Sequence, residues 1–298
     1  MNKNVRILMA TYNGAKYIEE QLDSLINQTY QDIDIFISDD GSTDETVSII
    51  KQYIEKDSRI HIESSNHLGA CQNFGNLLRK YGDTDYVMLC DQDDIWSLDK
   101  VEKTVNVMQT NEEEGMPLLI YSGRIYVDET LQRMNIVVRT YEDTFRSLLC
   151  QCHIYGCTMM LNREMIEIVD IPEFASMHDH WIALTASCKG KIVRMDEELM
   201  LYRQHANNVT GGRKQFSFFN KIKNWDKIND EGKQTNRMCY KFCKDNSDNL
   251  IAREYLAIYD RQGLFRLLRA LKFGYKFDHL LATIRGLYIL LITTISEE

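Results

Sequence analysis

The chain contains few of the residues that interrupt or cross-link a fold. Only two of its 298 residues are proline, and no Ser-, Gly- or Gln-rich stretch separates one part from another. This composition argues against a long flexible linker. The eight cysteines lack the paired spacing of a zinc ribbon, and in a reducing compartment we expect them to be thiols. One main domain with an appendage fits these absences best.

Three further absences narrow the class of protein. The N-terminus, Met1 to Val5, lacks the basic and apolar regions of a signal peptide, so we expect a cytoplasmic location. The apolar run from Leu280 to Ile295 contains Arg285 and falls short of the ~20 residues that span a bilayer. Net charge is −9, divided into −15 before Gly211 and +6 from there on. An acidic body argues against a nucleic-acid partner.

Strand-like and helix-like segments alternate in the first half of the chain. Apolar, β-prone runs predict strands, and apolar residues at helical spacing predict helices. The expected strands are 5–10, 33–38, 59–63 and 86–90, and the expected helices include 17–28 and 70–79. Ser42-Thr43-Asp44-Glu45 has capping-box spacing and predicts another helix start. Repeated βα units imply an α/β fold with a mostly parallel sheet and ligands beyond its carboxyl ends.

Polar motifs follow three of the expected strands, which places them at one edge of the sheet. They are Thr11-Tyr12-Asn13-Gly14, Asp39-Asp40-Gly41-Ser42 and Asp91-Gln92-Asp93-Asp94. The Gly-x-Gly-x-x-Gly of a dinucleotide-binding enzyme is missing after the first strand, and so is the Gly-Lys-Ser/Thr of a P-loop. These absences argue against a dehydrogenase and a P-loop enzyme.

The third motif places three carboxylates in one short loop. Such groups repel one another and are costly to desolvate, which suggests a bound cation. Oxygen ligands suit Mg²⁺ or Mn²⁺, and these ions commonly bridge a protein to a diphosphate. The alternative is a solvated acidic turn before a helix that begins near Ser97. Taken alone, so short a motif favours that alternative.

In order and spacing together, the three motifs resemble the family 2 glycosyltransferases. The matching segments are Met9–Asn13, Ser38–Asp44 and Leu89–Asp94, and the resemblance runs from Val5 to about Gly212. It implies the GT-A fold, in which a nucleotide-binding α/β half is joined to an acceptor half.

The resemblance also implies a domain organisation. The catalytic domain would span residues 1–212, with a nucleotide-binding part over about 1–96 and an acceptor part over about 97–212. A basic, amphipathic and helical region would follow over residues 213–298.

Residues for the donor nucleotide follow from the same resemblance. They are Thr11, Tyr12, Asn13, Glu19, Asp39, Asp40, Asp91 and Arg203. Thr11 and Tyr12 would line the nucleobase pocket, and Asp40 would hydrogen-bond the base. For Asp39 and Asp40 the alternative is a role as helix N-cap and dipole partners.

The metal shell would consist of Asp93, Asp91 and His205, with Asp94 instead stabilising the following helix. His205 belongs to a segment, Tyr202 to Asn208, that resembles the Tyr-Arg-x-His-x-x-Asn of rhamnosyltransferase-like bacterial members. There Arg203 would face the diphosphate through its planar fork, and a neutral imidazole would complete the metal shell. The alternative for His205 is an ordinary surface histidine.

A catalytic base is expected in the acceptor half. Met177 to Trp181 precedes an apolar helical run and resembles the segment in which the family places its catalytic carboxylate, so Asp179 is the candidate. An inverting transfer needs this group within hydrogen-bond reach of the acceptor hydroxyl. The alternative is a helix cap. The family's commoner Glu-Asp pair is here His178-Asp179, which leaves the role of the histidine open.

Acceptor or sugar contacts are predicted for Trp96, His178 and Trp181, because flat aromatic faces match pyranose rings. Core packing is an equal alternative for the two tryptophans.

The C-terminal region mixes leucines, aromatic residues and basic residues, as in Leu264 to Lys272. Interfacial helices on a membrane surface, packing on the catalytic domain and a homodimer interface are the alternatives.

The function that these observations favour is an inverting, metal-dependent glycosyltransferase of the hexosyltransferase class. It would move a sugar from dTDP-rhamnose or a UDP-hexose to a hydroxyl of a saccharide or lipid-linked saccharide, in bacterial surface-polysaccharide synthesis. A sugar-phosphate nucleotidyltransferase would typically open with a Gly-x-Gly loop that Thr11–Gly14 does not supply. A nucleotide-sugar-binding protein without turnover would need no base such as Asp179.

Overall fold

The computed structural model describes residues 3–136, 142–205, 225–275 and 280–295. The chain forms two compact units. The first unit is Met1–Val137, Ile154–Glu173 and His178–Gly212, and the second is Val138–His153, Phe174–Met177 and Arg213–Glu298. The second unit therefore takes in two short segments from within the range expected for the catalytic domain.

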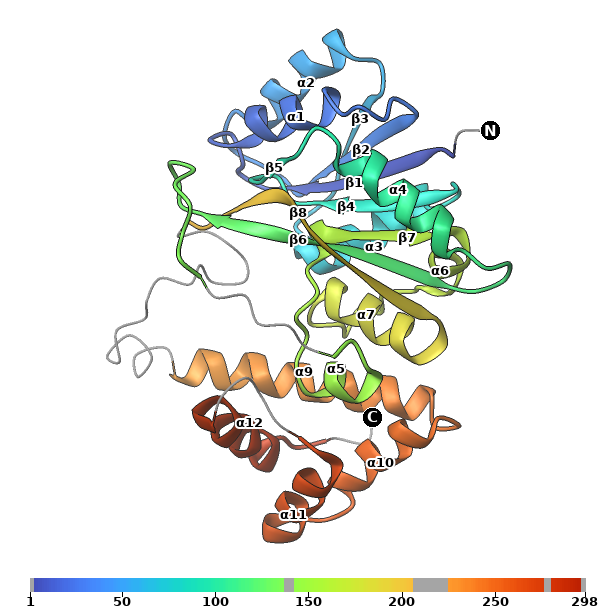
Figure 1. The fold of residues 1–298 in the computed structure, drawn as a ribbon. Coiled ribbons are helices and arrows are strands. Elements are labelled where there is room, and N and C mark those ends of the chain that lie inside the picture. The colour runs from blue at the N-terminus through green and yellow to red at the C-terminus, as the bar shows by residue number, and fades with distance from the viewer. Residues whose placement is uncertain (1–2, 137–141, 206–224, 276–279, 296–298) are drawn as a thin grey trace. The chain divides into compact units, whose positions relative to one another are not determined.

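An eight-stranded sheet forms the centre of the first unit, in the order β3-β2-β1-β4-β7-β6-β8-β5 (Figure 1). Its strands are β1 (Val5–Thr11), β2 (Ile33–Asp39), β3 (Ile60–Ser64), β4 (Tyr86–Cys90), β5 (Ile95–Trp96), β6 (Leu118–Val127), β7 (Met159–Asn162) and β8 (Lys191–Arg203). Strands β1 to β4 pair in parallel, which confirms the expected α/β architecture. β7 runs antiparallel to both β4 and β6, so the other half of the sheet is mixed.

Helices of the first unit connect these strands. They are α1 (Ile18–Ile26), α2 (Thr46–Lys56), α3 (Gly69–Tyr81), α4 (Lys100–Asn111), α6 (Arg163–Ile168) and α7 (His178–Lys189), with a 3₁₀ turn η1 at Gly156–Thr158. The elements predicted up to β4 begin and end within two residues of these bounds. The helix start predicted after Ser42–Glu45 is confirmed by α2, but the capping box does not form, because the Thr46 N–H donates to Asp44 Oδ1 at 3.1 Å. Ser42 Oγ instead donates to Asp39.

Strand β4 lies in the middle of the sheet and is buried along its whole length. All five of its side chains, Tyr86 to Cys90, have no exposed surface. A strand covered on both faces reads as a continuous apolar run, which is why the sequence predicted its bounds. The acidic loop thus begins at a rigid point of the core.

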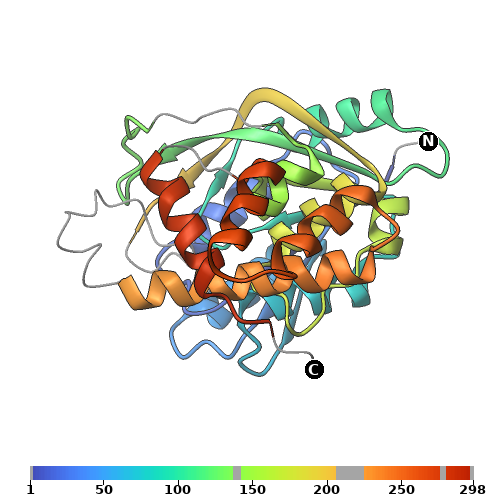
Figure 2. The same ribbon diagram turned by 90° about the horizontal axis from the view of Figure 1, so that it is seen from below.

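The second unit is helical in its described part. It contains α5 (Phe145–Cys150), α9 (Trp225–Asp245), α10 (Leu250–Tyr259), α11 (Gly263–Phe273) and α12 (Leu280–Ile292), which Figure 2 shows from below. Its core includes Phe145, whose ring lies 5.8 Å from that of Phe242, and the buried Tyr255 and Phe273. Among the residues with described positions, no helix is long and apolar enough to cross a membrane.

Candidate active site

The loops that follow β1 and β4 are joined by one side chain. β1 pairs in parallel with both β2 and β4, so the three loops begin side by side. Tyr12 donates its backbone N–H to Gln92 Oε1 at 2.9 Å, and Gln92 Nε2 donates back to the Tyr12 carbonyl at 3.0 Å. A Cβ on Gly14 would lie 2.2 Å from Gln92 Oε1, so the paired geometry requires glycine there. The acidic loop is therefore clamped to the first loop.

Asn13 joins the first loop to the second. Its Oδ1 accepts the Thr43 N–H at 2.8 Å, and its own N–H donates to Ser42 Oγ at 2.8 Å. Asn13 adopts φ 47°, a left-handed conformation that Asn tolerates better than most residues. Tyr12 beside it is 49% exposed and meets the ring of His67 edge-on at 6.0 Å. The sequence did not single out His67.

Both carboxylates of the second motif are engaged by the protein. Asp39 is buried and accepts hydrogen bonds from Thr11 Oγ1 at 2.9 Å and from the Ser42 N–H at 2.9 Å. Asp40 accepts the N–H groups of Leu68 at 2.7 Å and Gly69 at 2.8 Å, at the start of α3. Asp40 therefore stabilises a helix end, though not that of the helix next to it in sequence. Its contact with a nucleobase stays a prediction.

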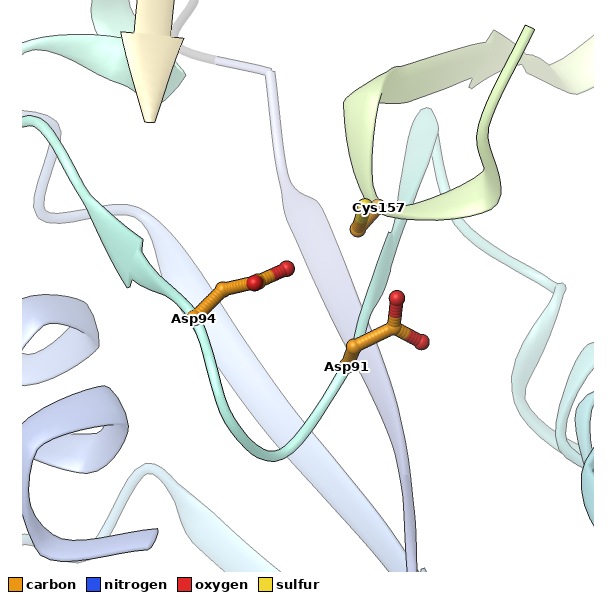
Figure 3. Close-up of side chains that lie close together, drawn as sticks. All are labelled: Asp91, Asp94 and Cys157. Atoms are coloured by element: carbon orange, nitrogen blue, oxygen red, sulfur yellow. The ribbon is translucent and has the colours of Figure 1, made fainter. Parts of the chain in front are cut away.

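The acidic loop brings Asp91 and Asp94 together with Cys157 of η1. One ligand atom from each lies within 4.8 Å of the others, and Figure 3 shows the three side chains converging. Asp94 has no exposed surface. Its Oδ1 accepts the Arg203 N–H of β8 at 3.0 Å, and its Oδ2 has no hydrogen-bond partner. The expectation that Asp94 stabilises the following helix is thus wrong, because its acceptor serves β8.

Electrostatics of this group favour a bound cation. Burial, with repulsion from Asp93, raises the pKa of Asp91 to about 7, and the same causes raise the pKa of Asp94 well above its ordinary value. A divalent ion would favour the ionised carboxylates and give the orphaned Asp94 oxygen a partner. Hard oxygen donors suit Mg²⁺ or Mn²⁺. Burial raises the pKa of the Cys157 thiol well above its usual value, so it is a poor ligand for such ions.

Asp93 and His205, two of the predicted metal ligands, meet directly. Asp93 Oδ2 lies 2.7 Å from His205 Nε2, and the imidazole stacks on Tyr17 of the first loop, with ring centroids 4.9 Å apart. Residues 206–208 of the matching segment lie outside the described residues. The structure therefore pairs Asp93 with His205, and groups Asp91 with Asp94 and Cys157.

Arg203, which the sequence led us to expect at the diphosphate, is surrounded by groups of the protein. It is 2% exposed. Its guanidinium donates to the carbonyls of Asp93 at 2.9 Å and Glu129 at 3.1 Å, and pairs with the Glu20 carboxylate. The same group lies 4.6 Å from the centre of the Tyr17 ring. Arg203 thus fixes the backbone of the acidic loop, because its fork suits carbonyl acceptors as well as phosphate oxygens.

Lys100 is a buried cation that the sequence did not indicate. It has no exposed surface, and its Nζ donates to the Cys157 carbonyl at 2.6 Å and lies 3.6 Å from the centre of the Trp96 ring. Burial lowers the pKa of Lys100 to about 8, although Asp94 and Asp91 favour its charged form. Trp96 is therefore a core residue. Its role as a sugar platform is wrong, because the buried ring cannot stack on a ligand.

Asp179 lies in the first turn of α7 and close enough to the acidic loop to interact with it. Its Oδ1 accepts the His180 N–H at 2.7 Å, and its charge contributes to the raised pKa of Asp91. His178 is 7% exposed and stacks on Phe74 with ring centroids 4.3 Å apart. Burial lowers the pKa of His178. His178 and Trp181 are about as buried as Asp179, and their predicted sugar contacts stay predictions.

Comparisons with known proteins show the family to which the chain belongs. The model of the glycosyl transferase family 2 matches residues 6–168. The dTDP-rhamnosyl transferase RfbG of Shigella flexneri is 32% identical over 222 residues, which cover 70% of this chain and 75% of that protein. The UDP-Glc:alpha-D-GlcNAc-diphosphoundecaprenol beta-1,3-glucosyltransferase WfaP of Escherichia coli is 27% identical over 210 residues, which cover 70% of this chain and 80% of that protein.

Solved structures share the fold. The mannosyltransferase PcManGT from Pyrobaculum calidifontis, in complex with GDP-Man and Mn²⁺, matches with a TM-score of 0.58 at 14% identity, over 97% of this chain and 73% of that one. TarS 1-349 of S. aureus, in complex with UDP-GlcNAc, matches with a TM-score of 0.56 at 18% identity, over 69% of this chain and 60% of that one. Hydrogen bonds join the loops at the carboxyl ends of β1, β2 and β4, and the fold is GT-A-like. The family model matches most of the first unit. The chain therefore belongs to the family 2 glycosyltransferases and is a glycosyltransferase.

Proposed function

We propose that the protein transfers a sugar from a nucleoside-diphosphate donor to a saccharide hydroxyl, with inversion and with a divalent cation at the acidic loop. The observation that carries the proposal is the pair of crowded carboxylates, Asp91 and Asp94, directly after the buried strand β4. A cation would favour the ionised form of both carboxylates, whose pKa values are raised, and would give the unpartnered Asp94 oxygen a ligand.

Asp91 and Asp93 would hold the cation on its donor side, because both are partly exposed whereas Asp94 is fully buried. His205 lies against Asp93 and would complete the shell or orient that carboxylate. When bound, the ion supplies positive charge to the departing diphosphate. The Mn²⁺ in the PcManGT complex supports Mg²⁺ or Mn²⁺ as the cofactor of this chain.

Asp179 is the proposed general base. Its carboxylate would take the proton of the acceptor hydroxyl while that oxygen bonds to the anomeric carbon and the bond to the diphosphate oxygen breaks. Its electrostatic coupling to Asp91 supports a position near the diphosphate. The neighbouring His178 stacks on Phe74, and burial lowers the pKa of His178, which favours a neutral imidazole beside the base.

The donor base would stack on the exposed ring of Tyr12, near His67. RfbG is named for dTDP-rhamnose and WfaP for UDP-glucose, and these names support a dTDP-rhamnose or UDP-hexose donor. WfaP is also named for a diphosphoundecaprenol acceptor, which supports a lipid-linked saccharide in surface-polysaccharide synthesis.

A nucleotide-binding panel tests the metal and the donor. We expect one of UDP, dTDP and GDP to raise the melting temperature with Mn²⁺ and not with EDTA, because a ligand that binds the native state stabilises it by mass action. Asp93→Asn should lose this response. Asp170→Asn, an exposed carboxylate on the same unit, should keep it. A nucleotide response that ignores EDTA and Asp93→Asn would remove the metal from the proposal.

Transfer itself tests the base. Asp179→Asn should retain the nucleotide response and lose transfer by roughly 10²–10⁴-fold. Intact donor binding without any transfer by the wild type, across dTDP- and UDP-sugars and their acceptors, would favour a nucleotide-sugar-binding protein without turnover.

A further inference from the structure

Two helices of the second unit expose apolar side chains at helical spacing. On α11, Leu264, Leu268 and Leu271 stand at i, i+4 and i+7, and each is more than half exposed. On α12, Ile284, Tyr288 and Leu291 repeat the same spacing and are exposed as well. Residues at this spacing lie on one face of a helix. Each helix therefore carries a solvent-facing apolar stripe.

The stripe on α11 is additional to the face that builds the core. Ala270 and Phe273 of the same helix are buried within the second unit, and the Phe273 ring lies 5.6 Å from that of Tyr255. A helix that only covers a core presents polar residues on its other side. α11 is apolar on both, which indicates that its outer face meets a second apolar environment.

Arg266, on the same side of α11 as the buried Ala270 and Phe273, joins α11 to α12. Arg266 of α11 donates from Nη1 to the carbonyls of Leu290 at 3.3 Å and Thr293 at 3.0 Å, at the C-terminal end of α12. Phe265 precedes Arg266 and is the most exposed large apolar residue of the described chain, and Leu291 follows Leu290. The two helices that carry the exposed apolar residues are thus held together by these hydrogen bonds.

The charge of the residues around the exposed apolar surface of α11 and α12 indicates which kind of partner it binds. The described residues from 260 to 295 contain five basic side chains, Arg261, Arg266, Arg269, Lys272 and Arg285, and one acidic side chain, Asp260. The protein as a whole carries −9. A self-complementary dimer through this surface would place positive charge against positive charge. The partner that fits this surface has an apolar interior and anionic groups at its boundary with water.

We propose that α11 and α12 form an interfacial surface that binds a bilayer with anionic headgroups. The leucines and Phe265 enter the boundary between headgroups and acyl chains, and Arg261 and Lys272 lie against the headgroups. Neither helix spans the bilayer.

Vesicle sedimentation of the full chain tests this proposal. The wild type should bind phosphatidylcholine vesicles containing 30% phosphatidylglycerol, and bind pure phosphatidylcholine vesicles far more weakly. Leu264→Gln/Leu268→Gln should reduce the partition coefficient at least about tenfold, because two half-exposed leucines no longer enter the bilayer. Lys272→Gln should reduce it about fivefold on the anionic vesicles only. Leu98→Gln, an equally exposed leucine of the first unit, is the matched control and should change nothing.

Three results would overturn the proposal. The first is that the wild type does not bind anionic vesicles, and the second is that the Leu264→Gln/Leu268→Gln variant binds them as well as the wild type does, with an unchanged melting temperature. The third is a wild-type dimer in sedimentation equilibrium that does not bind vesicles and that dissociates in the same variant. The vesicles contain neither donor nor acceptor, so the result is independent of the glycosyl-transfer proposal.

Discussion

Gly14 and Gln92 offer a sharp test of how the loops of the active site are held together. The side chain of Gln92 exchanges two hydrogen bonds with the backbone of Tyr12, at 2.9 and 3.0 Å. A methyl group at position 14 would lie 2.2 Å from Oε1 and 2.6 Å from Cδ of Gln92. Gly14→Ala must therefore expel the side chain of Gln92 from this clamp.

The expected energies follow from these contacts. A net value of about 1 kcal/mol per hydrogen bond gives a loss of about 2 kcal/mol for Gln92→Ala. Gly14→Ala should cost a similar amount, because it breaks the same two bonds. The double variant should again lose about 2 kcal/mol, so the coupling energy is about −2 kcal/mol. With Gln92 already truncated, Gly14→Ala should be neutral or stabilise by about 0.4–1 kcal/mol through the unfolded state.

Urea unfolding of the four proteins measures this coupling. The nucleotide panel with Mn²⁺ should report weaker donor binding in all three variants, because the acidic loop has lost its attachment to the first loop. Additive losses of about 4 kcal/mol in the double variant would refute the reasoning, because they would place the cost of Gly14→Ala somewhere other than at Gln92.

Three other predictions concern buried groups. Asp94→Asn should raise stability at pH 7–8, where the ionised carboxylate with its raised pKa is costly, and should weaken Mn²⁺ binding in calorimetry; destabilisation at this pH would contradict it. Burial lowers the pKa of His178 in the folded protein, so this residue binds a proton more readily in the unfolded chain. The stability of the protein should therefore fall as the pH drops below about 6.5. His178→Phe should abolish that part of the fall in melting scans between pH 5 and 8. Arg203→Lys should cost about 2–4 kcal/mol in urea unfolding, because the carbonyls of Asp93 and Glu129 lose their donors; a change within 0.5 kcal/mol would show that these bonds are dispensable.

The sequence predicted best where one physical effect dominates. Strand β4 is apolar on both faces and its bounds matched, and β1 to β3 carry the same simple signal. The mixed half of the sheet, from β7 to β5, gave no such signal. β8 alternates irregularly, with Asp196, Glu197 and Glu198 in its middle, and its register against β6 is interrupted at Gly123.

The structure brings some of the predicted site residues together, such as Asp93 and His205, but the sequence did not indicate the direction of the side chains. Arg203 was identified from its motif, yet its fork satisfies backbone carbonyls within the protein. Trp96 was predicted to stack on a sugar, but the Lys100 ammonium covers the face of its ring. Cys157 joins the acidic loop from a turn more than sixty residues away, and only the pairing of β7 with β4 brings it there.

The contact between Lys100 and Trp96 makes the indole an optical reporter. The ammonium lies 3.6 Å from the ring centre and shares its surroundings with Asp91 and Asp94, so a change of charge in that group alters the electric field at the chromophore. Raising the pH through about 8 discharges Lys100 and should shift the emission of Trp96, an effect absent from Trp96→Phe. A cation arriving at the carboxylates should shift the emission as well. The fluorescence of Trp96 would thus report cation binding at the active site without a label.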